Sequence, residues 1–307
     1  MTRMVALDED YHVHSVFSDG VSSIDENVLA ARERGLRTLC LVDHVRAGTG
    51  WVPDFVRAVW PLRALAGIHI LAGVEAKILD RAGWLDLPAS IDGIDLLLIA
   101  DHQFPGDDGP VDPQVMRAAL EGGQASAPDV IGCLVEATAN AVQRVASAAP
   151  QSEPAAPRSE PAAPRPLIAH LFSVLPKLGL DESQVPDRLL GMLAEQARRA
   201  GALVEVNEKW GCPSARSLQA FGRAGVPIVA STDSHDCADI GQYVRVRRIL
   251  AEAARPSQEG VAGPVAPAEA GPVAPAEAGP VAPAEAGPAG QARHGRGAGE
   301  TATGPPQ

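Results

Sequence analysis

The stretch Val226-Pro-Ile-Val-Ala-Ser-Thr-Asp233-Ser-His235-Asp236 decides the fold. Its short apolar run is typical of a buried β-strand, and Asp233 and His235 follow at the carboxyl end of that strand. In α/β barrels, the carboxyl ends of the strands build the functional site. A carboxylate and an imidazole at this position suit a metal ion, so we expect further ligands at the ends of other strands.

Six earlier apolar runs have the same character and alternate with segments of helical composition. Strands are expected over residues 11–14, 38–42, 68–74, 94–100, 167–172, 202–206 and 226–231. Helices are expected over residues 23–34, 51–66 with a kink at Pro61, 113–149 with a break near 122–128, 186–200, 214–223 and 239–253. Polar ligand candidates follow six of the strands and must converge. A distorted (β/α)7 barrel is therefore favoured over an open doubly wound sheet.

Composition indicates one domain and two segments outside it. Residues 256–307 are almost entirely Gly, Pro, Ala, Val and Glu, with three copies of Gly-Pro-Val-Ala-Pro-Ala-Glu-Ala, and are predicted to be a disordered tail. A Pro/Ala-rich tandem repeat predicts an inserted spacer at 147–166, because the strand pattern resumes directly after it. Residues 1–255 are therefore expected to form a single catalytic barrel domain.

Charge and cysteine usage narrow the class of protein. The net charge of −12 argues against a long nucleic acid as partner. The four cysteines form no Cys-x-x-Cys pair, which is typical of reduced thiols. No signal peptide and no run of about 18 apolar residues is present, so we expect a cytoplasmic protein without a membrane partner.

Six of the eight histidines lie at or just beyond the ends of predicted strands. With neighbouring carboxylates they make nine candidate metal ligands: His12, His14, Asp19, His44, Glu75, His102, His170, Asp233 and His235. Nine ligands exceed the needs of one ion and suit two or three. Nitrogen and oxygen ligands without a thiolate favour Zn²⁺, Mn²⁺ or Fe²⁺. His69, at the start of its strand, is expected at the opposite rim and is interpreted as structural.

In order, these motifs resemble those of the PHP (polymerase and histidinol phosphatase) superfamily. The resemblance covers residues 8–252 and is strongest to short stand-alone bacterial PHP phosphatases. These have motifs similar to Trp60-Pro61, residues 73–78 and Glu205-Val-Asn207. It implies a trinuclear site. The first ion would be held by His12, His14, Glu75 and Asp233, the second by Glu75, His102 and His170, and the third by Asp19, His44 and His235. The sequence departs from the family pattern in the long segment between His102 and His170, and in Asp101 before His102.

Three divalent ions against three carboxylates would leave a net positive pocket that suits a phosphate dianion. A metal-activated hydroxide is expected to attack phosphorus, with Glu75, Asp233 and His235 as the catalytic ligands. Asp43 and Asp101 would either orient neighbouring ligands or be ordinary surface carboxylates. Lys77, Lys209 and Arg216 are candidates for binding the phosphate, and Arg216 is preferred because its guanidinium is bidentate.

These observations predict a phosphatase that acts on a phosphomonoester of a small metabolite, of the histidinol phosphate, nucleotide or sugar phosphate type. One alternative is phosphodiester cleavage like that of a 3′–5′ exonuclease, which the acidic charge balance disfavours. The amidohydrolase pattern also begins with His-x-His, but it ends in one late Asp. This chain instead ends in Asp233-x-His235 and adds Glu75. A non-catalytic metal-binding PHP scaffold would have lost a ligand, and all nine are present here.

Overall fold

The computed structural model describes residues 5–148 and 163–255. Within these ranges, seven strands form one sheet in which every neighbouring pair is parallel and the order follows the sequence. The strands are β1 Glu9–Val13, β2 Thr38–Val45, β3 His69–Lys77, β4 Leu96–Ala100, β7 Arg165–Ile168, β8 Leu203–Asn207 and β9 Ile228–Ser231. The predicted set of seven parallel strands is confirmed.

The first and last strands meet just beyond their carboxyl ends. The backbone N–H of His14 donates to the carbonyl of Ser234 at 2.8 Å, and that of Ser234 donates to the carbonyl of His12 at 3.3 Å. Below this bridge, the buried carboxylate of Asp10 accepts hydrogen bonds from the backbone N–H and the hydroxyl of Thr232. The sheet is therefore nearly closed, and its strands converge on one rim as in a barrel.

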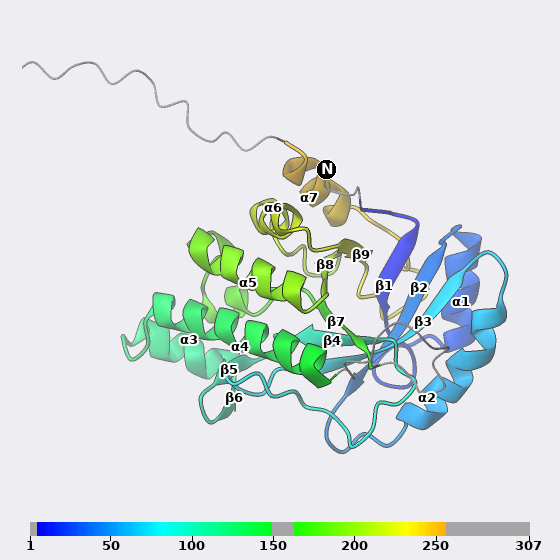
Figure 1. Ribbon diagram of the computed structural model, residues 1–307, viewed down its shortest axis with the longest axis horizontal. Helices are drawn as coiled ribbons and strands as arrows, with labels where there is room; N and C mark the ends of the chain where they lie inside the picture. Colours follow the sequence, from blue (N-terminus) through cyan, green and yellow to red (C-terminus); the bar gives the residue numbers. More distant parts are fainter. Residues whose placement is uncertain (1–4, 149–162, 256–307) are drawn as a thin grey trace, which may run out of the picture. The chain divides into compact units, whose positions relative to one another are not determined.

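Helices surround this sheet (Figure 1). They are α1 Ile24–Glu33, α2 Val52–Val59, α3 Pro113–Glu121, α4 Ala127–Ala148, α5 Asp187–Arg199, α6 Ala215–Ala224 and α7 Arg245–Ala253, with short 3₁₀ helices η1 Trp60–Ala64, η2 Leu175–Leu178 and η3 Glu182–Gln184. Ser23 and Glu26 form a reciprocal capping box at the start of α1. The kink expected at Pro61 appears as the change from α2 to η1.

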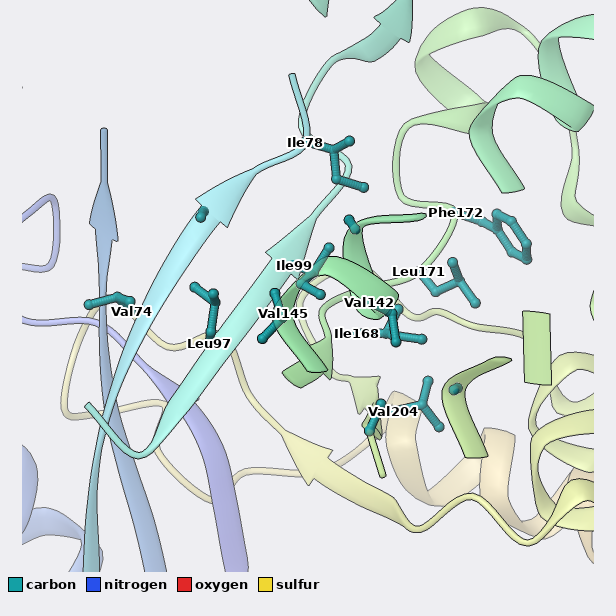
Figure 2. Packing of buried hydrophobic residues seen from close by; sticks show 14 of the residues in the cluster. Val74, Ile78, Leu97, Ile99, Val142, Val145, Ile168, Leu171, Phe172 and Val204 are labelled. Atoms are coloured by element: carbon teal, nitrogen blue, oxygen red, sulfur yellow. The ribbon is translucent and has the colours of Figure 1, made fainter. Parts of the chain in front are cut away.

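The alternation of side chains along each strand creates two apolar layers. On β4, Leu97 and Ile99 point outward to the helices, whereas Leu98 packs inside the barrel. Figure 2 shows Val142 and Val145 of α4 beside Ile99 in the outer layer. A fully buried side chain of this size contributes about 1.5–3 kcal/mol to stability. The two layers thus hold the strand ends rigidly in place.

Gly73, two residues before Glu75, lies where the barrel interior has no room for a Cβ atom. A Cβ atom at this position would lie 2.9 Å from Cγ2 of Val42 and 3.0 Å from Sγ of Cys40. Neither neighbour can retreat easily, because both are fully buried. Glycine therefore allows β3 to approach β2 closely enough to bring Glu75 into the middle of the rim.

Several boundaries differ from the sequence predictions. The last helix starts at Arg245 rather than at residue 239, because the carboxylate of Glu208 accepts hydrogen bonds from three consecutive backbone N–H groups at 244–246. The predicted spacer 147–166 is too long, since α4 continues to Ala148 and β7 begins at Arg165. Residues 149–162 of that spacer, and the predicted tail at 256–307, lie outside the described residues.

A hairpin, β5 Phe104–Gly106 and β6 Gly109–Val111, was not predicted. Its strands are too short for an alternating pattern to be visible in sequence. The break expected between two helices near 122–128 is confirmed, and Gly123 there adopts the left-handed conformation with φ 70°. In the described part of the chain, no helix is both long and apolar enough to cross a membrane.

Candidate metal centre

The nine side chains predicted as metal ligands lie at the carboxyl ends of six strands and in the loops that follow. Three groups have potential ligand atoms within 4.8 Å of one another: His12, His14 and Asp233; His44, Glu75 and His102; and His14, Asp19, His44 and His235. The ninth residue, His170, places Nε2 2.8 Å from Glu75. The fold therefore brings all nine into one cluster.

Glu75 lies at the centre of this cluster and is only 1% exposed. Its Oε2 lies 3.2, 3.5 and 3.0 Å from ring nitrogens of His12, His14 and His44, respectively. Its Oε1 lies 3.0 and 2.8 Å from Nε2 of His102 and His170. Each carboxylate oxygen thus faces a different set of imidazoles, which is the arrangement needed to bridge two ions.

His12 on β1 and His14, just beyond the carboxyl end of β1, face each other in the cluster. Nε2 of His12 lies 3.0 Å from Nε2 of His14, and Oδ1 of Asp233 lies 3.4 Å from the same nitrogen of His14. Two neutral imidazoles cannot both present lone pairs at this distance without a cation or a shared proton between them. The pair therefore fits a positive charge at this point.

Asp19 connects a further set of side chains at the pocket mouth. Its Oδ2 lies 3.5 Å from Nε2 of His44 and 3.4 Å from Nε2 of His235, while Oδ1 lies 3.7 Å from Nδ1 of His14. The family resemblance had implied a place for His14 only in the group with His12, Glu75 and Asp233. Its buried Nδ1 has no hydrogen-bond partner within residues 5–148 and 163–255, as expected for a nitrogen facing a ligand site.

Glu205 belongs to the family resemblance but was not predicted as part of the site. It lies fully buried on β8, where Oε2 is 3.1 Å from Nδ1 of His12 and Oε1 accepts from the backbone N–H of His170 at 2.6 Å. Asn207 donates to Oε1 from Nδ2 at 2.8 Å. A carboxylate behind a ligand imidazole fixes its tautomer and orientation. The sequence signal was a charged residue inside an otherwise apolar strand.

Asp43 and Asp101 are buried rather than exposed. Asp43 accepts hydrogen bonds from the backbone N–H and hydroxyl groups of Ser15 and Ser18, and so fixes the loop that carries Asp19. Oδ1 of Asp101 accepts from the hydroxyl of Ser173 at 2.7 Å, and this hydroxyl lies 3.0 Å from Nδ1 of His170. Both carboxylates therefore have the contacts of orienting groups.

At Glu75 and His170, the electrostatics of the cluster favour positive charge. Burial alone would raise the pKa of Glu75, but its interactions with His12 and His102 hold that pKa well below its usual range. Burial alone would lower the pKa of His170, but its hydrogen bonds to Asp101 and Glu75 raise it to about 10. Buried carboxylates that attract protons to imidazoles would equally attract metal cations. The donor set, nitrogen and oxygen without sulfur, fits Zn²⁺, Mn²⁺ or Fe²⁺.

A cavity of about 590 Å³ opens over the cluster, and two of the three predicted phosphate-binding residues line it. Lys209 places Nζ 3.2 Å from Oδ1 of Asp233, and Lys77 places Nζ 3.2 Å from Oε1 of Gln103. Arg216 does not line this cavity. Its guanidinium binds the carboxylate of Asp187 and backbone carbonyls near η3, so this placement gives its predicted role no support.

The remaining lining of the cavity was not predicted. Arg46, Asp86 and Trp210 contribute to its walls, together with Gln103. Arg46, Gln103 and Trp210 lie in the loops after β2, β4 and β8, and Asp86 lies in the connection between β3 and β4. Sequence position at strand ends could have suggested Arg46 and Trp210, whereas Asp86 carries no such signal.

Residues 10–147 match the family model described as PHP domain. Among curated proteins, a probable phosphatase of Vibrio vulnificus is 33% identical over 131 residues, covering 40% of this chain and 52% of that protein. A probable phosphatase of Serratia proteamaculans is 30% identical over 128 residues, covering 37% and 49%. The chain thus spans about half the length of the curated relatives it matches.

Two solved structures share the fold. Histidinol phosphate phosphatase of Lactococcus lactis, complexed with zinc, L-histidinol and phosphate, aligns with a TM-score of 0.55 at 18% identity, covering 80% of this chain and 93% of that one. A putative histidinol phosphatase of Listeria monocytogenes aligns with a TM-score of 0.51 at 16% identity, covering 76% and 97%. The nearly closed sheet, the cluster of histidines and carboxylates and the matching sequence together show that this chain contains a PHP domain, which the family model matches over residues 10–147.

Proposed function

We propose that this chain is a metal-dependent phosphatase that hydrolyses a phosphomonoester of a small metabolite. The observation that carries the proposal is the position of Glu75, whose two oxygens face separate sets of imidazoles in a buried cluster. Such a bridging carboxylate is typical of sites in which neighbouring ions act together on one phosphate. The curated relatives named probable phosphatases support the same reaction class.

We assign the nine clustered side chains to three divalent ions. His12, His14, Glu75 and Asp233 would hold the first, Glu75, His102 and His170 the second, and Asp19, His44 and His235 the third. The closeness of Asp19 to both His44 and His235 supports the third group. Nδ1 of His14, 3.7 Å from Asp19, faces this third group as well.

Bound ions would supply positive charge for the phosphoryl oxygens and lower the pKa of the attacking water. The protein's own side chains would position the substrate. Lys209, Lys77 and Arg46 line the cavity, and Nζ of Lys209 lies 3.2 Å from Oδ1 of Asp233. Among the ligands, we assign catalytic roles to Glu75, Asp233 and His235. These three line the cavity, as do Asp19, His44 and His102.

The cavity favours a small substrate over a polymer. Its volume of about 590 Å³ lies in the range of sites for small molecules. The net charge of −12 opposes broad contact with a nucleic-acid backbone. Histidinol phosphate belongs in the set of substrates to test, because the Lactococcus lactis phosphatase that shares the fold is complexed with L-histidinol and phosphate. Nucleotides and sugar phosphates complete that set. We assign the reaction to the domain formed by residues 1–255.

The test is release of inorganic phosphate from a panel of phosphomonoesters, with protein loaded with Mn²⁺ or Zn²⁺. The paired variants are His102→Ala and His69→Ala. His102 faces Glu75, whereas His69 is exposed at the opposite end of β3. We expect His102→Ala to lose most of the activity and His69→Ala to retain it. Absence of phosphate release from every substrate by the metal-loaded wild-type protein would refute the proposal.

A further inference from the structure

We infer that Trp210 is a positioning residue for the metal centre, because its indole N–H fixes the carboxylate of Asp233 in the orientation that a ligand requires. Nε1 of Trp210 donates to Oδ2 of Asp233 at 2.9 Å. The inference rests on the proposed metal centre, to which Asp233 belongs. It adds a residue that neither the ligand motifs nor the bridging geometry identifies.

The two oxygens of Asp233 have separate environments. Oδ2 accepts from the indole, whereas Oδ1 lies 3.4 Å from Nε2 of His14 and 3.6 Å from Nδ1 of His235. The indole therefore binds one oxygen, while the other makes the closest approaches to the imidazoles of His14 and His235. An indole can only donate, so it cannot compete for a cation as a second carboxylate or imidazole would.

The backbone does not fix Asp233 by itself. The residue lies two positions beyond the end of β9 and has φ 56°, in the left-handed region that few non-glycine residues adopt. Because φ does not set the χ angles of a carboxylate, the hydrogen bonds of its oxygens contribute to its side-chain orientation. Lys209 is the second partner, but its side chain is 45% exposed and contacts Oδ1, the oxygen directed towards the imidazoles.

Trp210 is 37% exposed and is held by contacts at its backbone and at its ring. Its backbone N–H donates to Oδ1 of Asn207 at 3.0 Å, and the Nδ2 group of Asn207 donates to Glu205, which contacts His12. On the ring, the ammonium of Lys177 lies 4.5 Å from the indole centroid. Strand β8 thus orients a first ligand through Glu205, and the loop that follows it orients a second through Trp210.

Substitution can separate two roles of Trp210, the hydrogen-bond donor and the aromatic ring. Trp210→Phe keeps an aromatic ring that can line the cavity and lie under Lys177, but removes the N–H donor. Loss of a group that orients a ligand typically costs about ten- to a hundredfold in metal affinity. A side chain that only fills space would leave metal affinity unchanged in the phenylalanine variant.

The experiment compares wild-type full-length protein, Trp210→Phe and Trp84→Phe after removal of metal. Zn²⁺ is titrated back in competition with a chromogenic chelator, and circular dichroism verifies the fold. Trp84 is the matched control, since it is 57% exposed, lines a separate cavity and lies under Arg144. We expect one class of Zn²⁺ sites to weaken about ten- to a hundredfold in Trp210→Phe and none in Trp84→Phe. We also expect excess Zn²⁺ to restore phosphate release by Trp210→Phe.

The outcomes separate this inference from the proposed function. Weaker Zn²⁺ binding in Trp210→Phe would support the positioning role even if no tested phosphomonoester is hydrolysed. Wild-type affinity in a folded Trp210→Phe would overturn it while leaving phosphatase activity intact. A wild-type protein that binds no Zn²⁺ would overturn both the positioning role and the proposed centre.

Discussion

Glu75→Gln tests the bridge directly. The substitution keeps the size and shape of a side chain that is 1% exposed, but removes its charge and replaces one oxygen by an amide group. Either orientation of the amide directs an N–H₂ group towards imidazoles that lie 2.8–3.5 Å from the native oxygens. If the carboxylate bridges two ions, both must lose an anionic partner.

The expected loss of metal affinity follows from the distance between the carboxylate and each ion. Unit charges about 4 Å apart interact by about 4 kcal/mol at the effective dielectric constant of a protein site. Each 1.4 kcal/mol changes an equilibrium constant about tenfold. After relaxation of the surroundings, we therefore expect metal affinity to fall by about two to three orders of magnitude. More than one ion's share should be lost, and phosphate release should fall severely.

The assay is elemental analysis of metal content per chain beside phosphate release, with circular dichroism to verify the fold. Glu195→Gln is the matched control, because Glu195 is a partly exposed carboxylate on α5 that pairs with Arg198 and Arg199 on the same helix. It should keep its metal and its activity. Full metal occupancy with normal activity in Glu75→Gln would show that this carboxylate does not belong to the centre.

Two further substitutions at the site and one deletion outside it also have defined expected outcomes. His235→Ala should remove about one ion's share of metal, since His235 shares its group with Asp19 and not with Glu75; elemental analysis would detect a larger loss. Gly20→Ala should disrupt the loop around Asp19, because its Cβ would lie 2.7 Å from backbone atoms, and it should lower both melting temperature and metal content. Deleting residues 256–307, which lack apolar periodicity, should leave kcat and melting temperature nearly unchanged. A large drop in either would show that the tail packs on the barrel.

The sequence alone revealed the strand order and the set of clustered side chains. Buried strands are short apolar runs, and polar residues at their ends, such as His44, Glu75 and Asp233, stand out against that background. In a parallel barrel all these ends share one rim, so chain position predicts proximity without knowledge of packing. The helix boundaries were less exact where a distant side chain determines them, as Glu208 does for α7.

Only the tertiary structure decided which other polar residues belong to the site. Arg216 follows β8 in sequence much as Lys209 does, yet it lies on α6 and binds Asp187, away from the cavity. Glu205 and Trp210 contact ligands on other strands, so their partners are far away in sequence. Periodicity reports the face on which a side chain lies. The direction of its polar atoms and the identity of its partner depend on loops and neighbouring strands, and these are fixed only when the barrel closes.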